Sequence, residues 1–312
     1  MDRFSERKII LVKRKTRLEE LVVRFNSAAQ AKFYVEHLGA DFSDYQQEHD
    51  EYLQALKKAG DILEKFGRTH ILERSYLQNF LFNPTDVVVA VGQDGMVANT
   101  LKYLYGQPLI GVNPSPGRWD GVLLPFLVRD LQTVIPEALQ NGRKYKEVTI
   151  AAVLLNDGQT LFAVNDFFIG QKTHLSARYE LTVGELSEKQ SSSGIIVSTG
   201  LGSTGWLKSI LEGAAGMAAK LTGNTLTMKT RDPFAWDSDH LYFSVREPFP
   251  SKTSGTNLVF GKITNAEPLK IVSHMPENGV IFSDGIESDF LEFNSGMGAT
   301  VTLAEKKGLL VV

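Results

Sequence analysis

One run of residues constrains the fold more than any other part of this sequence. Asp86-Val87-Val88-Val89-Ala90-Val91 is apolar at every position after the first and is rich in β-branched side chains. A strand that is apolar on both faces is typical of a parallel sheet with helices on both sides. The sequence therefore predicts a central parallel strand here, and with it an α/β domain.

The segments around this strand alternate between strands and helices, as such a domain requires. Short apolar runs at 9–12 and 109–112 predict two further strands. Apolar residues at helical spacing predict helices at 16–38, 43–66 and 97–105. The strand at 86–91 and the segments that follow it form one complete β-loop-α-β unit.

Beyond residue 142 the pattern changes to closely spaced strands with one clear helix, at 203–221. Such a run of strands predicts a mainly antiparallel β-rich domain. The strands are predicted at 147–155, 161–169, 177–183, 195–198, 240–245, 257–263, 269–274 and 280–283. We expect an α/β nucleotide-binding domain at 1–142 and a β-rich dinucleotide- and substrate-binding domain at 143–312. The final apolar strands, 300–303 and 309–312, need a surface to pack on, and the first domain is a candidate.

Composition excludes several classes of function. The chain has no cysteine, which rules out disulfides, thiolate zinc sites and cysteine nucleophiles. Its six histidines lack metal-ligand spacing, so no protein metal site is predicted. A formal net charge of -3 supplies no general field for nucleic acid. With no signal peptide or membrane-spanning segment in view, we expect a cytoplasmic protein that binds small-molecule nucleotides, not nucleic acid or membrane, as a homodimer or higher homo-oligomer.

The loop Gly92-Gln93-Asp94-Gly95 lies where the central strand meets the start of a helix, and open α/β sheets bind ligands at such points. Its glycines allow close approach by a phosphate, and the first N–H groups of the helix favour negative charge. A carboxylate would repel phosphate unless it takes a proton from an attacking hydroxyl or holds Mg²⁺ through water. The alternative is an ordinary turn in which Asp94 caps the helix.

A second Gly-rich turn, Thr199-Gly200-Leu201-Gly202-Ser203-Thr204-Gly205, matches the dinucleotide pattern G-x-G-x-x-G. It has no surrounding βαβ unit, and the segment 224–229 offers no strand ending in an acid for a ribose, which argues against a Rossmann oxidoreductase. A turn rich in N–H and hydroxyl donors suits phosphate or ribose oxygens. The alternative is a plain helix start capped by Ser203.

Two acidic positions interrupt apolar strands of the second half. Asn165-Asp166 predicts either a strand with one polar side chain facing inward toward a ligand base or ribose, or a bulge or turn. Asp284-Gly285 predicts a hairpin turn. Trp206, beside the second Gly-rich turn, either walls a base pocket or packs in the core. A P-loop NTPase is excluded because the chain lacks G-x-x-x-x-G-K-[ST].

Taken in order, these motifs resemble those of the NAD kinase family, which is related to the diacylglycerol and sphingosine kinases. The resemblance rests on Val91-Gly92-Gln93-Asp94-Gly95-Met96 for G-G-D-G-T, Gly111-Val112-Asn113 for G-[IV]-N, Asn165-Asp166 for N-[ED], residues 199–204 for T-x-T-G-S-T, and Ser283-Asp284-Gly285 for [FS]-D-G. Five ordered motifs are more specific than any one. The stretch 165–206 is most similar to the mitochondrial-type branch, and without a targeting segment a bacterial relative of that branch is the simpler interpretation.

The resemblance implies an α/β domain and a β-rich domain, and ATP-dependent phosphorylation of the adenosine ribose 2′-hydroxyl of NAD to give NADP. Asp94 would act there as catalytic base or orienting group. By the same resemblance, phosphates would be held at Gly92, Gly95, Gly202 and Ser203 with Asn113 shaping the cleft, and the dinucleotide would be bound by Asn165, Asp166, Thr199 and Thr204. Mg²⁺ would arrive with ATP, held mainly by phosphate oxygens.

Two departures from the family pattern lie in the first loop. Gln93 stands where the family has its second glycine, adding a side chain and restricting the backbone. Met96 replaces a threonine and removes a hydroxyl. Both favour an alternative, a nucleotide-binding member of the same fold with weakened or absent phosphoryl transfer, whereas Asp94 favours the enzyme. A sugar or lipid hydroxyl as acceptor, and polyphosphate as donor, also remain open.

Overall fold

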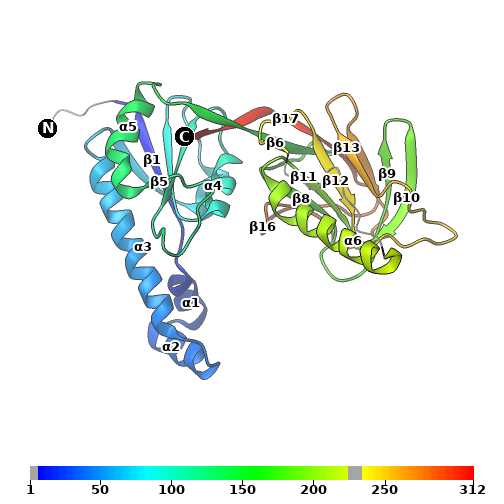
Figure 1. Cartoon of the computed structure of the whole chain (residues 1–312), viewed down its shortest axis with the longest axis horizontal. Coiled ribbons are helices and arrows are strands. Elements are labelled where there is room, and N and C mark those ends of the chain that lie inside the picture. Colours follow the sequence, from blue (N-terminus) through cyan, green and yellow to red (C-terminus); the bar gives the residue numbers. More distant parts are fainter. Residues whose placement is uncertain (1–5, 224–233) are drawn as a thin grey trace. The chain divides into compact units, whose positions relative to one another are not determined.

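A computed structural model of the chain describes residues 6–223 and 234–312, apart from the side chains of residues 287 and 288. The described chain divides into two compact units. Unit 1 comprises the residues up to Lys146 together with Gly308–Val312, and unit 2 comprises Glu147–Lys307 (Figure 1). Unit 1 is α/β and unit 2 is rich in β-strands, so the predicted fold class is confirmed. Across the described residues, no helix has the length and apolar character needed to cross a membrane.

The sheet of unit 1 is parallel, with the strand order β2-β1-β3-β4. Two more segments, the short strand β5 and the end of β17, pair with β4 in parallel. β3 is buried at every position, which confirms the predicted central strand. The strands are β1 (Lys8–Lys13), β2 (Arg68–Glu73), β3 (Val87–Val91), β4 (Pro108–Asn113), β5 (Phe126–Leu127) and β17 (Gly298–Val311).

Helices α3 and α5 share one apolar core with the sheet of unit 1, and α4 packs against β3 and β4. The helix predicted at 16–38 is in fact two, because Asn26 takes a left-handed conformation (φ 63°) and Ser27 caps the second helix. No helix was predicted at α5, which contains Pro136. The elements are α1 (Arg17–Phe25), α2 (Ala28–His37), α3 (Phe42–Leu63), α4 (Asp94–Leu101), α5 (Leu131–Leu139) and the 3₁₀ turns η1 (Arg74–Asn79) and η2 (Val128–Asp130).

Unit 2 is built from two sheets that enclose one apolar core. One sheet contains β10-β9-β14-β17 with β6 and β7, and the other has the order β13-β12-β11-β8-β15-β16. The pairing is antiparallel, as predicted. The strands are β6 (Tyr145–Leu155), β7 (Thr160–Ala163), β8 (Asp166–Gln171), β9 (Ala177–Val183), β10 (Leu186–Ser192), β11 (Ile195–Ser198), β12 (Leu241–Val245), β13 (Phe260–Ile263), β14 (Leu269–Ser273), β15 (Gly279–Ser283) and β16 (Ile286–Glu292).

Several element boundaries differ from the sequence-based prediction. The strand predicted at 161–169 is broken at Val164 and Asn165, so that β7 and β8 belong to different sheets. The two final strands form the single strand β17, which pairs with β14, β6 and β4. The helix predicted at 203–221 is a 3₁₀ turn, η3 (Gly202–Thr204), followed by α6 (Trp206–Thr222). The predicted absence of a ribose-binding acid at 224–229 lies outside the described residues.

Candidate functional site

The Asp94 carboxylate is held by the backbone of a neighbouring loop. Leu123 donates its N–H to Oδ1 at 2.7 Å, and Val122 donates its N–H to Oδ2 at 3.2 Å. Asp94 opens α4, but the residue at the N-cap is Gln93, and the Asp94 side chain is directed to the loop. The alternative in which Asp94 merely caps the helix is therefore wrong. The two backbone N–H groups hold the half-buried Asp94 carboxylate in one orientation at the carboxyl end of β3.

The other residues of this loop divide into supporting and open positions. Gly92 is buried, and a Cβ there would approach the Sδ of Met96 at 2.7 Å. Met96, which stands in place of the family's threonine, is buried in the core, and its sulfur packs under the backbone of Gly92. Gln93 has a φ of -116°, which any residue adopts, so the expected backbone restriction costs no strain. Gly95 is exposed, and a Cβ there would meet no atom within 4 Å.

Asn113, at the end of β4, shapes the loop that reaches Asp94. Its buried amide donates from Nδ2 to the carbonyl oxygen of Trp119 at 3.0 Å, and its Oδ1 accepts the N–H of Ser115 at 3.0 Å. Gly121 has a left-handed φ of 66°, and a Cβ there would lie 2.7 Å from the Asn113 Nδ2. Both polar ends of the Asn113 side chain are thus engaged in holding the loop.

The same loop is fastened to α3 by two further contacts. Ser115 donates its hydroxyl to Glu51 at 2.9 Å, and the Arg118 guanidinium pairs with Asp44 at 2.7 Å. Together with the bonds to Asp94, these contacts attach the loop at its beginning, middle and end. Because the loop is held at these points, its backbone N–H groups are already in position to bind the Asp94 carboxylate.

Tyr52 of α3 ties two strand ends together beneath this region. Its hydroxyl accepts the N–H of Arg14, after β1, at 2.9 Å, and donates to the carbonyl oxygen of Val91, at the end of β3, at 3.0 Å. Burial raises the pKa of Tyr52 to about 12, so the hydroxyl keeps its proton at neutral pH. Tyr52 was not predicted as a site residue, because a tyrosine on the apolar stripe of a helix gives no signal beyond core packing.

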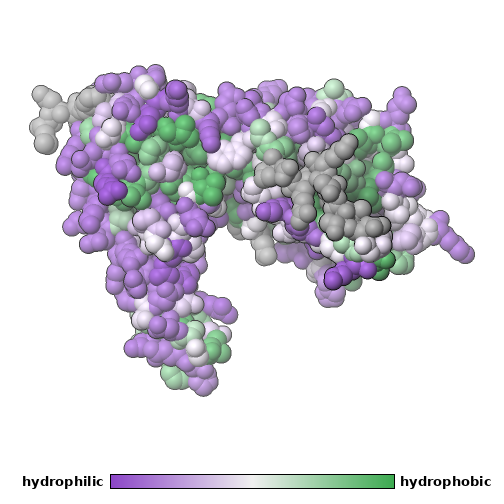
Figure 2. All heavy atoms as spheres, in the orientation of Figure 1, coloured by the Kyte–Doolittle hydropathy of each residue, from purple (hydrophilic) through white to green (hydrophobic). Residues whose placement is uncertain are grey.

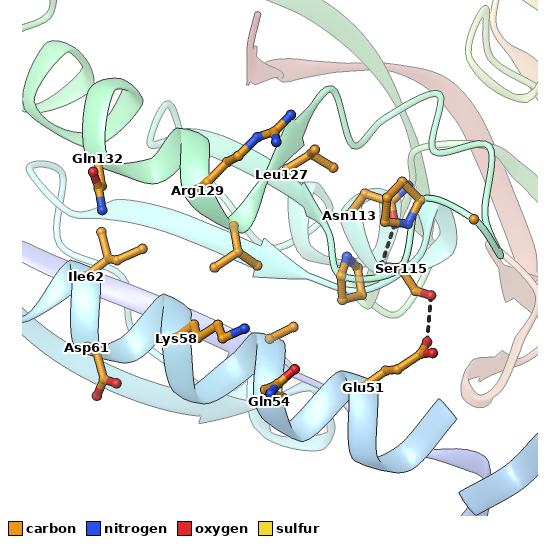
Figure 3. Close-up of a pocket in the computed structure, with 15 residues that line it drawn as sticks. Glu51, Gln54, Lys58, Asp61, Ile62, Asn113, Ser115, Leu127, Arg129 and Gln132 are labelled. Carbon is orange, nitrogen blue, oxygen red and sulfur yellow. Dashed lines mark hydrogen bonds between the residues drawn. The ribbon is translucent and has the colours of Figure 1, made fainter. Parts of the chain in front are cut away.

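A pocket of about 750 Å³ in unit 1 lies between α3, the loop after β4 and the segment that leads into α5. Figure 3 shows Glu51, Gln54 and Lys58 on α3, with Asn113 and Ser115 across the pocket. The carboxyl ends of β4 and β5 open into it, as in other α/β folds that bind ligands there. Asn113 lines this pocket and Asp94 does not.

In unit 2, Asp284 joins motifs that are about 120 positions apart in the chain. Its carboxylate accepts N–H groups from Val164 at 3.0 Å, Asn165 at 2.6 Å and Asp166 at 3.3 Å. Asp284 and Gly285 have φ values of 54° and 69° and connect β15 to β16, so the predicted hairpin turn is confirmed. From the residues alone Asp284-Gly285 was predicted only as a turn, and by resemblance it matched the family's [FS]-D-G motif; its carboxylate also shapes the 164–166 bend.

The second Gly-rich turn packs against the same bend. Thr199 is fully buried, donates its hydroxyl to the carbonyl oxygen of Val164 at 2.5 Å, and accepts the N–H of Gly202 at 3.2 Å. Its own N–H binds the carbonyl oxygen of Asn165 at 3.0 Å. A Cβ at Gly202 would collide with that same oxygen of Asn165. Thr199 and Gly202 therefore position Asn165 and Asp166 through the backbone.

The hydroxyls of this turn are not equally accessible. Ser203 is buried and donates to the carbonyl oxygen of Gly200 at 2.7 Å, whereas Thr204 is exposed. The N-cap of α6 is Gly205, so the alternative in which Ser203 caps the helix is wrong. Of the hydroxyls in this turn, that of Thr204 is the one presented to solvent.

Asp166 and Asn165 offer polar groups that the described residues leave unused. Neither side chain has a hydrogen-bond partner within 6–223 or 234–312. Burial, and then the neighbouring Asp284 carboxylate, raise the pKa of Asp166 to about 7. Strand alternation places Asp166 on the same face as Phe168, whose ring stacks on Trp206 with centroids 5.9 Å apart. Trp206 is 37% exposed, which favours the base-pocket interpretation over core packing.

The raised pKa of Asp166 predicts a pH dependence of stability. The folded chain keeps this proton to about pH 7, whereas the unfolded chain releases it near the ordinary value of 3.8, so stability falls as pH rises between these values. D166N removes the group and is expected to be more stable than the parent at pH 8 by roughly 2–4 kcal/mol. Urea unfolding at pH 8 and pH 4 tests this, because the difference should vanish at pH 4. An equal difference at both pH values would contradict it.

The chain is similar to known proteins in structure and not in sequence. No protein-family model matches the chain, and no curated protein matches it significantly in sequence. The structure of an NAD kinase from Archaeoglobus fulgidus in complex with ATP is similar with a TM-score of 0.57, at 16% identity, covering 98% of this chain and 93% of that one. The chain has the NAD kinase fold. Yeast NADH kinase complexed with NADH is similar with a TM-score of 0.56, at 14% identity, covering 99% of this chain and 84% of that one.

Within this NAD kinase fold, the predicted site residues form two groups, one in each unit. Unit 1 brings together Asp94, the glycines beside it and the loop that begins at Asn113. Unit 2 brings together the bend at Asn165 and Asp166, the turn at 199–204 and the hairpin at Asp284. Each group is internally connected by hydrogen bonds to backbone atoms.

Proposed function

We propose that this chain is an ATP-dependent kinase that phosphorylates the 2′-hydroxyl of the adenosine ribose of NAD to give NADP. The observation that carries the proposal is the Asp94 carboxylate, fixed by two N–H groups at the carboxyl end of the central strand. It stands beside the exposed and unobstructed Gly95 at the start of α4. Support comes also from the shared fold with a kinase bound to ATP and a kinase bound to NADH.

The proposed reaction needs a hydroxyl to be oriented and deprotonated beside a phosphate chain. Each Asp94 oxygen accepts one N–H and retains a lone pair for the ribose 2′-hydroxyl. The hydroxyl oxygen bonds to the γ-phosphorus, the bond from that phosphorus to the β–γ bridging oxygen breaks, and ADP leaves. The hydroxyl proton passes to Asp94 and then to solvent.

Charge on the phosphates is balanced by the backbone and by a metal ion in this proposal. The open Gly95 and the first N–H groups of α4 allow a phosphate to approach the positive end of the helix. The described residues contain no group of three or more histidine, aspartate or glutamate side chains that could hold a metal ion. In this proposal Mg²⁺ arrives with ATP, is held mainly by phosphate oxygens and neutralises their charge.

The proposal assigns the adenosine of the dinucleotide to unit 2. The unpartnered Asn165 amide and Asp166 carboxylate suit the donors and acceptors of a base or ribose. Phe168 and Trp206 on the same face supply aromatic surface for a base. The exposed Thr204 hydroxyl adds a further polar contact.

The experiment that tests the proposal is NADP formation from NAD, ATP and Mg²⁺, followed by an enzyme-coupled assay specific for NADP. We expect turnover with NAD and none when ATP is omitted. Parallel reactions with polyphosphate as donor, and with a sugar or a lipid alcohol as acceptor, identify the true substrates. Tight binding of NAD and ATP without turnover would overturn the proposal.

One observation favours a second candidate, a nucleotide-binding protein without phosphoryl transfer. Both oxygens of Asp94 already accept N–H groups from the 121–124 segment, so the carboxylate also has a purely structural use as a loop anchor. In that case nucleotides bind, and removing the carboxylate changes the loop but no reaction. The assay above separates the two candidates directly.

Gly95 gives a prediction that separates stability from ligand binding. G95A adds a methyl group where nothing lies within 4 Å, at a helical position without positive φ. The free energy of unfolding should therefore be unchanged or up to about 1 kcal/mol higher. Affinity for ATP, measured by calorimetry, is expected to fall at least tenfold, because the methyl occupies the space of the approaching phosphate.

The matched control is G213A, which changes another exposed glycine with open space around its Cβ position, within α6. It should show the same small gain in stability and no change in ATP affinity. Unchanged ATP affinity in G95A would show that phosphate does not approach the start of α4.

A further inference from the structure

A basic pocket of about 460 Å³ lies in unit 2, away from the 164–166 bend. It is bounded by Arg178 of β9, Lys189 of β10 and His274, which follows β14. β10 leads into β11, and it is the far end of β11, Ser198, that lies opposite Asp166. The pocket and the proposed adenosine site are thus at opposite ends of β11.

One wall of the pocket is a loop attached firmly at both ends. Phe249 donates its N–H to the carbonyl oxygen of Ser191 at 2.8 Å, and Gly255 donates its N–H to that of Lys189 at 2.9 Å. Between these points the loop projects beside β10 (Figure 1), and this projection is hydrophilic (Figure 2). An internal bond from the N–H of Ser251 to the carbonyl oxygen of Ser254, at 3.0 Å, closes it into a turn.

The opposite wall of the pocket carries the positively charged side chains of Arg178 and Lys189. Strand register places Arg178 opposite Ser191, and the N–H of His274 binds the carbonyl oxygen of Arg178 at 2.9 Å, so these three residues form one row across the sheet. Lys189 lies two register positions further along β10, opposite Glu180. None of the described residues that line the pocket is acidic.

The nearby carboxylates are engaged elsewhere. Glu180 accepts the hydroxyl of Ser187 at 2.8 Å, and Glu188 accepts N–H groups from Asn257 and Leu258. No ion pair within 6–223 and 234–312 involves Arg178 or Lys189. Two exposed cations line one concave surface and form no ion pair among the described residues, an arrangement that favours binding of an anion.

The loop presents hydroxyl donors to the same space. Ser254 donates its single hydroxyl hydrogen to the carbonyl oxygen of Phe249 at 2.8 Å, so in the 2.6 Å contact between Ser251 and Ser254 the donor is Ser251. The Thr253 hydroxyl lies 3.4 Å from the Ser251 oxygen, a weak contact, and is exposed. Thr253 can therefore donate to a ligand oxygen.

We propose that this pocket binds a diphosphate group, either as inorganic pyrophosphate or as part of a nucleotide. Arg178 offers a planar guanidinium suited to two phosphate oxygens, Lys189 a second charge, and Thr253 a neutral donor. A doubly or triply charged anion replaces the missing counter-charge of both cations at once, which a monovalent anion does not. The inference is independent of the function proposed for Asp94.

The absence of cysteine allows a test with a local probe. K252C places one thiol on the loop at a residue that does not line the pocket, and an environment-sensitive fluorophore attached there reports on the pocket alone. Titration of the full chain with inorganic pyrophosphate is expected to give a saturable signal. In the same labelled background, R178Q/K189Q should weaken binding at least tenfold.

The charge-matched control is K262Q/K270Q, which removes two exposed lysines elsewhere in unit 2. It should leave the affinity within about twofold, which excludes a general effect of net charge. Separate titrations with ATP and NADP identify the source of the diphosphate, and thermal unfolding confirms that the variants fold. No saturable signal with any of the three ligands, or equal weakening by both double variants, would overturn the proposal.

Discussion

D94N is expected to lower the rate of NADP formation by about 10²–10⁴-fold, the contribution of a positioned general base. Asparagine cannot accept the hydroxyl proton, and its amide nitrogen cannot accept either of the N–H groups that Val122 and Leu123 direct at the carboxylate. One of these two bonds is therefore lost, at a cost of about 1 kcal/mol. Initial rates measured at saturating NAD and ATP, together with thermal unfolding, check both parts.

A control variant distinguishes loss of the base from loosening of the loop. S115A removes the hydroxyl bond from the same loop to Glu51 and leaves the Asp94 carboxylate in place. It should lower stability by a similar amount and reduce the rate far less than D94N. If S115A and D94N reduce the rate equally, Asp94 acts as a loop anchor and the kinase mechanism proposed here is wrong.

D284A is expected to have the largest effect on unit 2. The N–H groups of Val164, Asn165 and Asp166 would lose the carboxylate that accepts them, and charged hydrogen bonds of this kind contribute about 1.5–3 kcal/mol each. We expect a loss of at least about 3 kcal/mol in the free energy of unfolding and at least a tenfold loss of NAD affinity. Urea unfolding and calorimetric titration with NAD measure the two effects.

A second consequence of D284A concerns the titration of Asp166. Removing the neighbouring carboxylate removes a repulsion, so the pKa of Asp166 should move down from about 7, while burial still holds it above its ordinary value. A pH titration of the carboxyl carbon followed by NMR detects this shift.

D157A serves as the control, because Asp157 is another turn aspartate, between β6 and β7, and among residues 6–223 and 234–312 its side chain accepts hydrogen bonds only from Gln159. It should cost less than about 1 kcal/mol and leave NAD affinity unchanged. Equal effects of D284A and D157A would show that Asp284 is an ordinary turn residue.

Much of the fold follows from local pattern. The run 87–91 is apolar on both faces, and a segment with that pattern is typical of a strand in the middle of a covered parallel sheet. Strands at 177–183 and 195–198 were predicted with their observed bounds, because alternation and flanking turn residues mark them clearly. The predicted strand ends were wrong where backbone pairing extends beyond the apolar pattern. β17 continues through Glu305 and two lysines, and it pairs with β6 as well as with β14 and β4; side-chain hydropathy carries no record of such pairing.

By itself, the sequence determined which short motifs stand where the chain turns: Gly92 to Gly95 after the central strand, Asn165-Asp166 within an apolar run, and the Asp284-Gly285 hairpin. The tertiary structure alone decided what their side chains do. The Asp94 carboxylate meets N–H groups 28 and 29 positions away, and Asp284 meets those of a bend about 120 positions away. The physical reason is that a carboxylate binds whichever donors the fold brings within about 3 Å, and sequence pattern constrains only neighbours along the chain.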